Sequence, residues 1–278
     1  MKDLVQKQLD KYAAKTEQDE ENALKEITQE IALYALAKSG FFEHAAFQGG
    51  TCLRIIHGLD RFSEDLDFAL NTPGKFDLGP FLEKTSEFMQ AYGFEMEVSG
   101  SEKADKTVQT RFLKDDSIKK LVTLKHLRDL KKKINIKVEI DTNPPDHAKV
   151  EMKFVEFPTD FSILSHDIPS LMSGKIHALL CRKFVKGRDW YDFSWYISEK
   201  ATPNYEYLAA ALKQTGPWEG KNLKVDRQWI KEALIDKINA LEWKKVIEDV
   251  TPFLNAQKKI DVEKVWSKEF FLMKASKL

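Results

Sequence analysis

The first regular pattern of apolar positions spans Glu20 to Lys38. Apolar side chains recur there at the period of an amphipathic helix; they are Leu24, Ile27, Ile31 and Tyr34. Ser39-Gly40 ends the run, as small and flexible residues often do. The same period returns between Leu78 and Tyr92, with Pro80 in the first turn, where proline is well tolerated. The sequence therefore predicts two amphipathic helices in the first third of the chain.

Alternation of apolar and polar residues predicts strands between and beyond these helices. In the run from Asp65 to Leu70 the apolar residues share one face, while Asp65 and Asp67 lie on the other. The run from Ile134 to Asp141 alternates in the same way. Shorter runs predict two more strands, at 94–98 and 107–113. The return from helix to strand indicates an α/β or α+β sheet.

The second half of the chain has a different pattern. Asn143-Pro144-Pro145 marks a turn, and beyond Ser162 nearly every apolar run has helical spacing. Asp167 is a suitable N-cap for the first of these helices. We therefore expect two domains: residues 1–145, a core that includes the N-terminal helix, and residues 146–278, a mainly helical C-terminal domain.

Composition is that of an ordinary globular protein, with 42% hydrophobic and 32% charged residues. Lys plus Arg equals Asp plus Glu, at 44 each, so net charge indicates no particular partner. Cys52 and Cys181 have no spacing that suits zinc, and both fit small buried side chains in a reducing compartment. The sequence shows neither a signal peptide nor an apolar run long enough to span a membrane. These features predict a cytoplasmic protein with no membrane partner.

A short segment combines two features that suit phosphate chemistry. Gly49, Gly50 and Thr51 precede a short amphipathic run that Gly58 closes. Glycine lets a backbone approach phosphate closely, and a helix start offers free N–H groups to an anion. Asp65 and Asp67 follow, side by side on a strand, as oxygen ligands that suit magnesium or manganese. Either feature alone fits a tight turn or two solvated acids, but together, in this order, they indicate phosphoryl or nucleotidyl transfer.

Three further charged features stand out. Lys175 lies on or beside an apolar helix face, either as a snorkelling side chain or as a functional cation. Asp189 and Asp192 share a helix face, either as a surface ion-pair site or as functional acids. A basic segment, residues 114–133, fits either a guarded sheet edge or a surface for a phosphate backbone; its cations include Lys119, Lys120, Lys125, Arg128, Lys131, Lys132 and Lys133.

The motifs carry a resemblance to a known family. GGTCLR followed by RFSEDLDF resembles the signature of the nucleotidyltransferase superfamily, and most closely the AbiEii/AbiGii-type toxins of bacterial toxin–antitoxin and abortive-infection systems. SGKIHALLCRKFVKGRDWYDFSWY is similar to that family's second signature block, and the likeness runs from about Glu20 to Leu254. Cys52 stands where a small residue such as alanine is more usual. The implied fold is α+β: a nucleotidyltransferase-like mixed sheet with flanking helices, followed by an all-helical C-terminal region.

The resemblance also implies an activity. It implies a nucleotidyltransferase toxin that uses Mg²⁺ or Mn²⁺ and transfers NMP from an NTP to an RNA acceptor, with tRNA expected and a cognate antitoxin as partner. The implied catalytic residues are Asp65, Asp67 and Lys175, with Asp189 or Asp192 left open. The implied nucleotide-binding residues are Gly49, Gly50, Thr51, Arg54, Ser63 and Lys175. A third metal-facing acid is expected from the neighbouring strand, where Glu139 is favoured over Asp141 because it lies mid-strand.

Two other functions fit the same residues. A nucleotidyltransferase of this kind can modify a small molecule or a protein, and a strongly negative cleft would favour a cationic small molecule. A catalytically inactive binding protein of the same fold is the third alternative. It is disfavoured by the presence of both aspartates and the lysine. A neighbouring gene for a helix-turn-helix antitoxin would favour the toxin.

Overall fold

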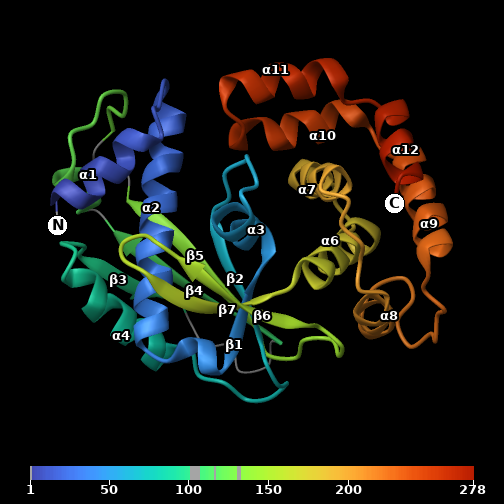
Figure 1. Ribbon diagram of the computed structural model, residues 1–278, viewed down its shortest axis with the longest axis horizontal. Helices are drawn as coiled ribbons and strands as arrows, with labels where there is room; N and C mark the ends of the chain where they lie inside the picture. Colours follow the sequence, from blue (N-terminus) through green and yellow to red (C-terminus); the bar gives the residue numbers. More distant parts are fainter. Residues whose placement is uncertain (1, 101–106, 116, 130–132) are drawn as a thin grey trace. The chain divides into compact units, whose positions relative to one another are not determined.

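The computed structural model describes residues 2–100, 107–115, 117–129 and 133–278. Its helices are α1 (Lys2–Lys11), α2 (Glu17–Lys38), η1 (Phe41–Glu43), α3 (Gly49–His57), α4 (Gly79–Gln90), α5 (Ile118–Leu121), α6 (Ile168–Cys181), α7 (Gly187–Ser198), α8 (Tyr205–Gln214), α9 (Arg227–Asn239), α10 (Trp243–Val250), η2 (Thr251–Phe253), α11 (Ala256–Val265) and α12 (Lys268–Ser276). Its strands are β1 (Ala45–Gln48), β2 (Asp65–Leu70), β3 (Met96–Ser99), β4 (Val108–Asp115), β5 (Ile134–Asp141), β6 (Val150–Val155) and β7 (Phe161–His166). Figure 1 labels most of these elements.

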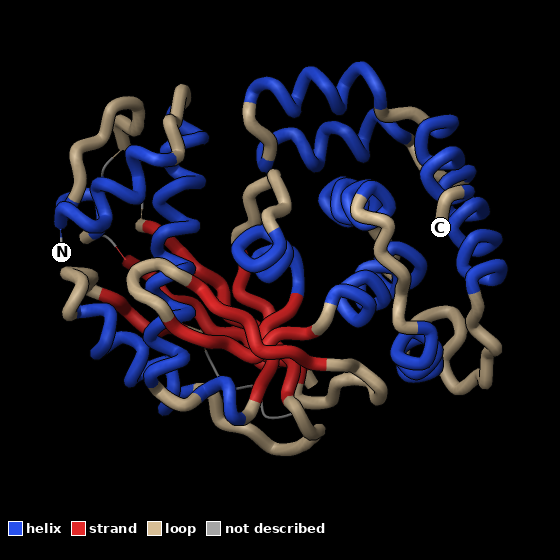
Figure 2. Tube along the Cα trace, viewed as in Figure 1, coloured by secondary structure: helices blue, strands red, loops and turns tan. Residues whose placement is uncertain are grey.

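The strands form one mixed sheet, drawn in red in Figure 2, with the order β3-β4-β5-β2-β1-β7-β6. β2 runs parallel to β5 and antiparallel to β1, and β1 runs parallel to β7. Every regular element after β7 is helical. The predicted α+β fold, a mixed sheet with flanking helices and a helical C-terminal region, is confirmed.

The chain forms two compact units. Unit 1 comprises Met1–Gly58, Phe62–Pro144 and Met152–Ser165. Unit 2 comprises Leu59–Arg61, Pro145–Glu151 and His166–Leu278. The division at residue 145 stays a prediction, because compactness alone does not show that either segment folds by itself.

Unit 1 has its core on the apolar face of the sheet. The alternating residues of β5 are buried as predicted, and α2 packs against this strand (Figure 1). Helix α2 begins at Glu17, earlier than the apolar pattern indicates, because Thr16 and Asp19 form a capping box. Phe41 lies edge-on to Phe68 of β2, with 4.8 Å between ring centroids. The opposite, polar face of β2 carries Asp65 and Asp67 and is not part of this core.

Unit 2 has an aromatic core. Trp190 of α7 contacts both Trp243 of α10 and Phe271 of α12, and the last two rings stack at 4.4 Å. A side chain at Gly187 would collide with the main chain at Val246, so glycine is what lets α7 and α10 approach. Asp167 caps α6 as the sequence predicts, accepting from the Ser170 N–H at 2.9 Å.

Candidate active-site residues

The glycine-rich loop leads directly into α3. Gly49 has a φ of +79°, and a side chain there would collide with the carboxylate of Asp67. Thr51 is fully buried, and its hydroxyl donates to the main-chain oxygen of Asp65. Gly58, with a φ of +72°, caps the other end of the helix as predicted. The loop is therefore packed against the strand that carries both aspartates.

The polar face of the sheet gathers charged side chains from adjacent strands. In register, Asp65 lies beside Lys137 and Asp67 beside Glu139, so these side chains emerge on one face. The ammonium group of Lys137 lies 2.7 Å from Glu139 Oε1, which also accepts from the Thr110 hydroxyl at 3.0 Å. Burial alone would lower the pKa of Lys137, but the hydrogen bond to Glu139 and the nearby aspartates outweigh it and raise the pKa. Lys137 shares this face with Glu139, as the alternation of the strand predicts, but the ion pair between them was not predicted.

The donor set fits a cation that the protein shares with its substrate. Among the described residues, no three His, Cys, Asp or Glu side chains are grouped as a metal site. Asp65 and Asp67 are half-buried neighbours on one strand face. Mg²⁺ is commonly held by one or two carboxylates together with substrate phosphates. The two aspartates suit that arrangement, whereas the Glu139 carboxylate is bound to Lys137 and Thr110; its role as third acid stays a prediction.

Arg54 and Ser63 were both predicted to contact the nucleotide. Arg54 Nε donates to both carboxylate oxygens of Glu26, at 3.1 and 2.9 Å. Its guanidinium also lies over the Phe62 ring, 4.7 Å from the centroid. The main-chain oxygen of Ser63 accepts from the Gln29 amide at 3.2 Å. These contacts hold both residues in unit 1, and phosphate binding by either remains a prediction.

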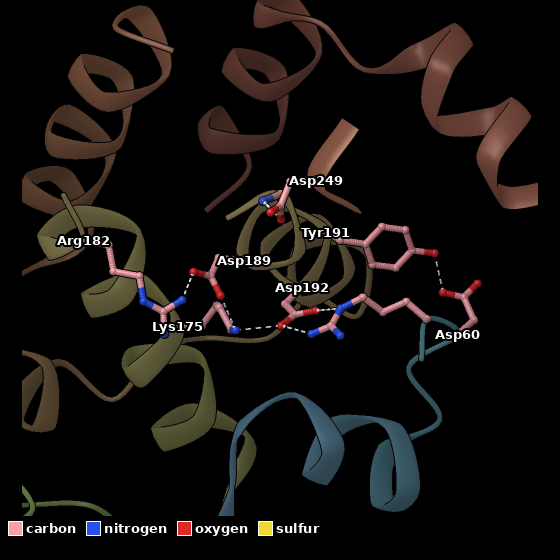
Figure 3. Close-up of polar contacts among 9 residues, drawn as sticks. Asp60, Lys175, Arg182, Asp189, Tyr191, Asp192 and Asp249 are labelled. Atoms are coloured by element: carbon pink, nitrogen blue, oxygen red, sulfur yellow. Dashed lines mark hydrogen bonds and ion pairs between the residues drawn. The ribbon is translucent and has the colours of Figure 1, made fainter. Parts of the chain in front are cut away.

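In unit 2 the predicted lysine and both predicted acids form one buried cluster. The Lys175 ammonium group on α6 lies 2.7 Å from Asp189 and 2.8 Å from Asp192, both on α7 (Figure 3). Arg182 also pairs with Asp189. Both aspartates are buried, so the surface-ion-pair alternative is wrong. A snorkelling Lys175 is also wrong, because its ammonium group is paired with both carboxylates and does not extend into water. The structure brings Lys175, Asp189 and Asp192 together without selecting one acid.

Arg61 completes the cluster and was missed from the sequence. Its Nε and Nη2 donate to the two carboxylate oxygens of Asp192, each at 2.7 Å. The side chains are 2% and 0% exposed. Burial alone would lower the pKa of Arg61, but the charges of Asp192 and Asp189 outweigh it and raise the pKa. The only available signal was that Arg61 opens RFSEDLDF, in a segment between the phosphate loop and the aspartate strand.

Asp60, next to Arg61, also contacts residues of unit 2. Asp60 accepts a hydrogen bond from the Tyr191 hydroxyl at 2.6 Å (Figure 3) and pairs with Lys258 at 2.6 Å. Residues 59–61, which join α3 to β2 along the chain, are thereby fixed within unit 2. Three cations and two carboxylates give the cluster one net positive charge; Arg61, Lys175, Asp189 and Asp192 lie inside it, and Arg182 lies at its half-exposed edge. Such a cluster can attract an anion.

Most of the chain matches one known protein family. Residues 31–272 match the family described as nucleotidyl transferase AbiEii toxin, type IV toxin–antitoxin system. The match spans most of the chain and includes both signature blocks. The chain belongs to the AbiEii family. It is therefore a nucleotidyltransferase of the toxin class, as the resemblance implies, and family membership implies an NTP substrate, a divalent metal and an antitoxin partner.

Solved structures agree with the fold of an AbiEii protein. The chain is similar to JHP933 from Helicobacter pylori, with 16% identity, a TM-score of 0.51, and coverage of 90% of this chain and 88% of that one. It is also similar to MenT4, a nucleotidyltransferase toxin from Mycobacterium tuberculosis, with 15% identity, a TM-score of 0.50, and coverage of 98% and 99%. No curated protein matches the sequence. None of the described helices could cross a membrane.

The basic segment of this AbiEii chain is held by acidic residues. The N–H groups of Lys125, His126 and Leu127 donate to the Glu20 carboxylate at 2.9, 2.9 and 2.6 Å. Lys133 pairs with Glu97 at 3.0 Å, and Lys125 with Asp10 at 3.7 Å. Lys131 and Lys132 lie outside the described residues, as does the side chain of Lys119. RNA binding by this segment remains a prediction.

Proposed function

We propose that this AbiEii-family chain transfers NMP from an NTP to an RNA end, with tRNA as the expected acceptor and Mg²⁺ as the expected ion. One observation carries the proposal: Asp65 and Asp67 share the polar face of β2, and the loop glycine Gly49 packs against Asp67 without room for a side chain. A phosphate loop in contact with paired carboxylates suits a metal-bound triphosphate. A cytoplasmic location and a cognate antitoxin belong to the same proposal.

Each residue has a distinct task in this scheme. The main-chain N–H groups of Gly49, Gly50 and Thr51 bind phosphate oxygens, and Thr51 holds the loop against Asp65 through its hydroxyl. Asp65 and Asp67 would hold the ion. When bound, it offsets charge on the triphosphate as pyrophosphate leaves.

The buried cluster of unit 2 contains the cation that we propose binds phosphate. Lys175 is the proposed phosphate-binding residue, because its ammonium is a compact charge held in place by Asp189 and Asp192. Asp189 also pairs with Arg182, and Asp192 pairs with Arg61. Both acids therefore serve to position cations. A preorganised charge of this kind costs no rearrangement when negative charge develops.

The test uses purified protein with each labelled NTP in turn, Mg²⁺ and total RNA. Wild type should label RNA with one or more NTPs. Asp65→Asn and Asp67→Asn should abolish labelling without changing the urea midpoint, because both side chains lie on a half-exposed face. Asp160→Asn, at an exposed position of unit 1, is the matched control and should retain activity. Full labelling by the double Asn variant would refute the proposal. Labelled protein or small molecules without labelled RNA would refute RNA as the acceptor.

A further inference from the structure

Unit 2 contains a second charged feature, whose residues begin just beyond the second signature block and continue to the end of α12. A cavity of about 470 Å³ is lined by four cations, which we call the basic pocket: Lys200, Arg227, Lys274 and Lys277. Lys200 follows the end of α7, Arg227 begins α9, and the other two lie at the end of α12. Helix α12 packs against both α7 and α9. The cations of three separate segments are thus gathered by the tertiary structure.

The positive charge of this pocket is not neutralised by acidic side chains. No Asp or Glu is among its described lining residues, and none of the four cations forms an ion pair there with a described acidic residue. Lys274 instead donates to neutral acceptors, the Ser194 main-chain oxygen at 3.1 Å and the Ser198 hydroxyl at 2.8 Å. Arg227 Nε donates to an oxygen of Leu278, the C-terminal residue of the structure, so the charge of Arg227 is offset by the carboxylate there. The three lysines carry like charges around one cavity, and this arrangement favours the binding of an anion.

The surroundings of Lys274 lower the pKa of its ammonium group. Partial burial lowers its pKa, and the positive charge of Lys277 lowers it further. Lys200, Arg227 and Lys277 are exposed, so a large anion can reach them. The remaining lining includes the half-buried Tyr205, whose ring offers a flat surface to a base. The pocket therefore combines cations with a surface typical of nucleic-acid contacts.

We propose that the basic pocket binds the phosphate backbone of the RNA acceptor. This rests on the proposed function, which makes RNA the acceptor, and it adds where in unit 2 that RNA is held. Lysine is a flexible point charge that contacts phosphates in many arrangements, which suits a backbone more than one fixed group. Cations on three segments also match charges spaced along a chain, whereas a free NTP concentrates its charge at one end.

The experiment measures RNA binding without requiring catalysis. The double variant Lys200→Gln/Lys277→Gln changes two exposed side chains, so folding should be unaffected. Filter binding of total tRNA is recorded across a range of NaCl concentrations. If each lysine contacts one phosphate, the log–log salt slope should become shallower by about 1.4, and affinity at 0.15 M salt should fall about 15-fold. Binding of NTP, measured in parallel, should be unchanged.

The control is Lys221→Gln/Lys224→Gln, which removes the same charge from exposed positions of unit 2 outside the pocket. An equal loss of RNA affinity in this control would overturn the proposal, because general attraction would then explain the effect. Unchanged RNA affinity in the pocket variant would also overturn it. If that variant instead loses NTP or polyglutamate binding, the pocket serves a nucleotide or an acidic protein. A pocket-dependent RNA affinity without any labelling of RNA would support the pocket and refute only the proposed function.

Discussion

The buried pair of Arg61 and Asp192 makes the sharpest prediction about this protein. Asp192→Asn keeps the shape of the side chain but removes the negative charge that faces Arg61 and Lys175. Lys175 keeps Asp189 at 2.7 Å as its partner, so the main loss falls on Arg61, which is 2% exposed. A buried cation without its counter-charge is strongly unfavourable. We expect the variant to lose stability in unit 2.

The magnitude follows from the burial and geometry of the pair. Both hydrogen bonds are 2.7 Å long and the carboxylate is fully enclosed. Removing one partner of such a buried pair costs about 3–5 kcal/mol in unfolding free energy. Because domains are stable by only about 5–15 kcal/mol, this is a large share of the total. The melting temperature should fall by roughly 10 °C.

The assay can observe unit 2 selectively. All six tryptophans, Trp190, Trp195, Trp218, Trp229, Trp243 and Trp266, belong to that unit. Urea unfolding followed by tryptophan fluorescence therefore reports the packing around Asp192. The double variant Arg61→Met/Asp192→Leu removes both charges and should recover most of the lost stability. Its transfer activity should stay low, because Lys175 loses the Asp192 carboxylate that helps to hold its ammonium group in place.

Two results would contradict this reasoning. A wild-type urea midpoint for Asp192→Asn would show that the pair carries little stability. A double variant as unstable as the single one would show that the loss does not come from unpaired charge.

Two further predictions concern unit 1. Gly49→Ala should reduce transfer by at least an order of magnitude, because its side chain would displace the Asp67 carboxylate; Gly58→Ala, with a similar positive φ but open space around it, is the matched control and should retain activity in the RNA-labelling assay. Burial and the charge of Glu26 raise the pKa of Glu30 to about 8. A raised carboxyl pKa favours the folded state at low pH, so the stability contributed by this group is complete below about 4.3, the unfolded value, and is lost as pH rises through about 8. Glu30→Gln should therefore be more stable than wild type at pH 9 by up to a few kcal/mol and similar at pH 4, measured by urea unfolding; no gain at pH 9 would refute the raised pKa.

Patterns in the sequence predict several elements of this protein, although not the strands β1, β6 and β7. Helical spacing predicts α2 and α4, and alternation predicts β2 and the full length of β5, because the face that a side chain takes follows from its position in a regular element. The same rule places Asp65 and Asp67 on one strand face, beside a glycine whose backbone suits phosphate. The start of α2 was predicted less well than its apolar face, because the capping box at Thr16 begins the helix before the apolar pattern does.

Which charged side chains contact one another depends on the tertiary structure. Arg61 and Asp192 are 131 residues apart, and no periodicity relates them. Lys137 joins the aspartate face through the register of β2 with β5, which the sequence of either strand leaves open. The four cations of the basic pocket come from the ends of three helices. Local patterns encode which face is buried, whereas the partner across that face depends on how distant segments pack, and buried charges in particular require such a partner.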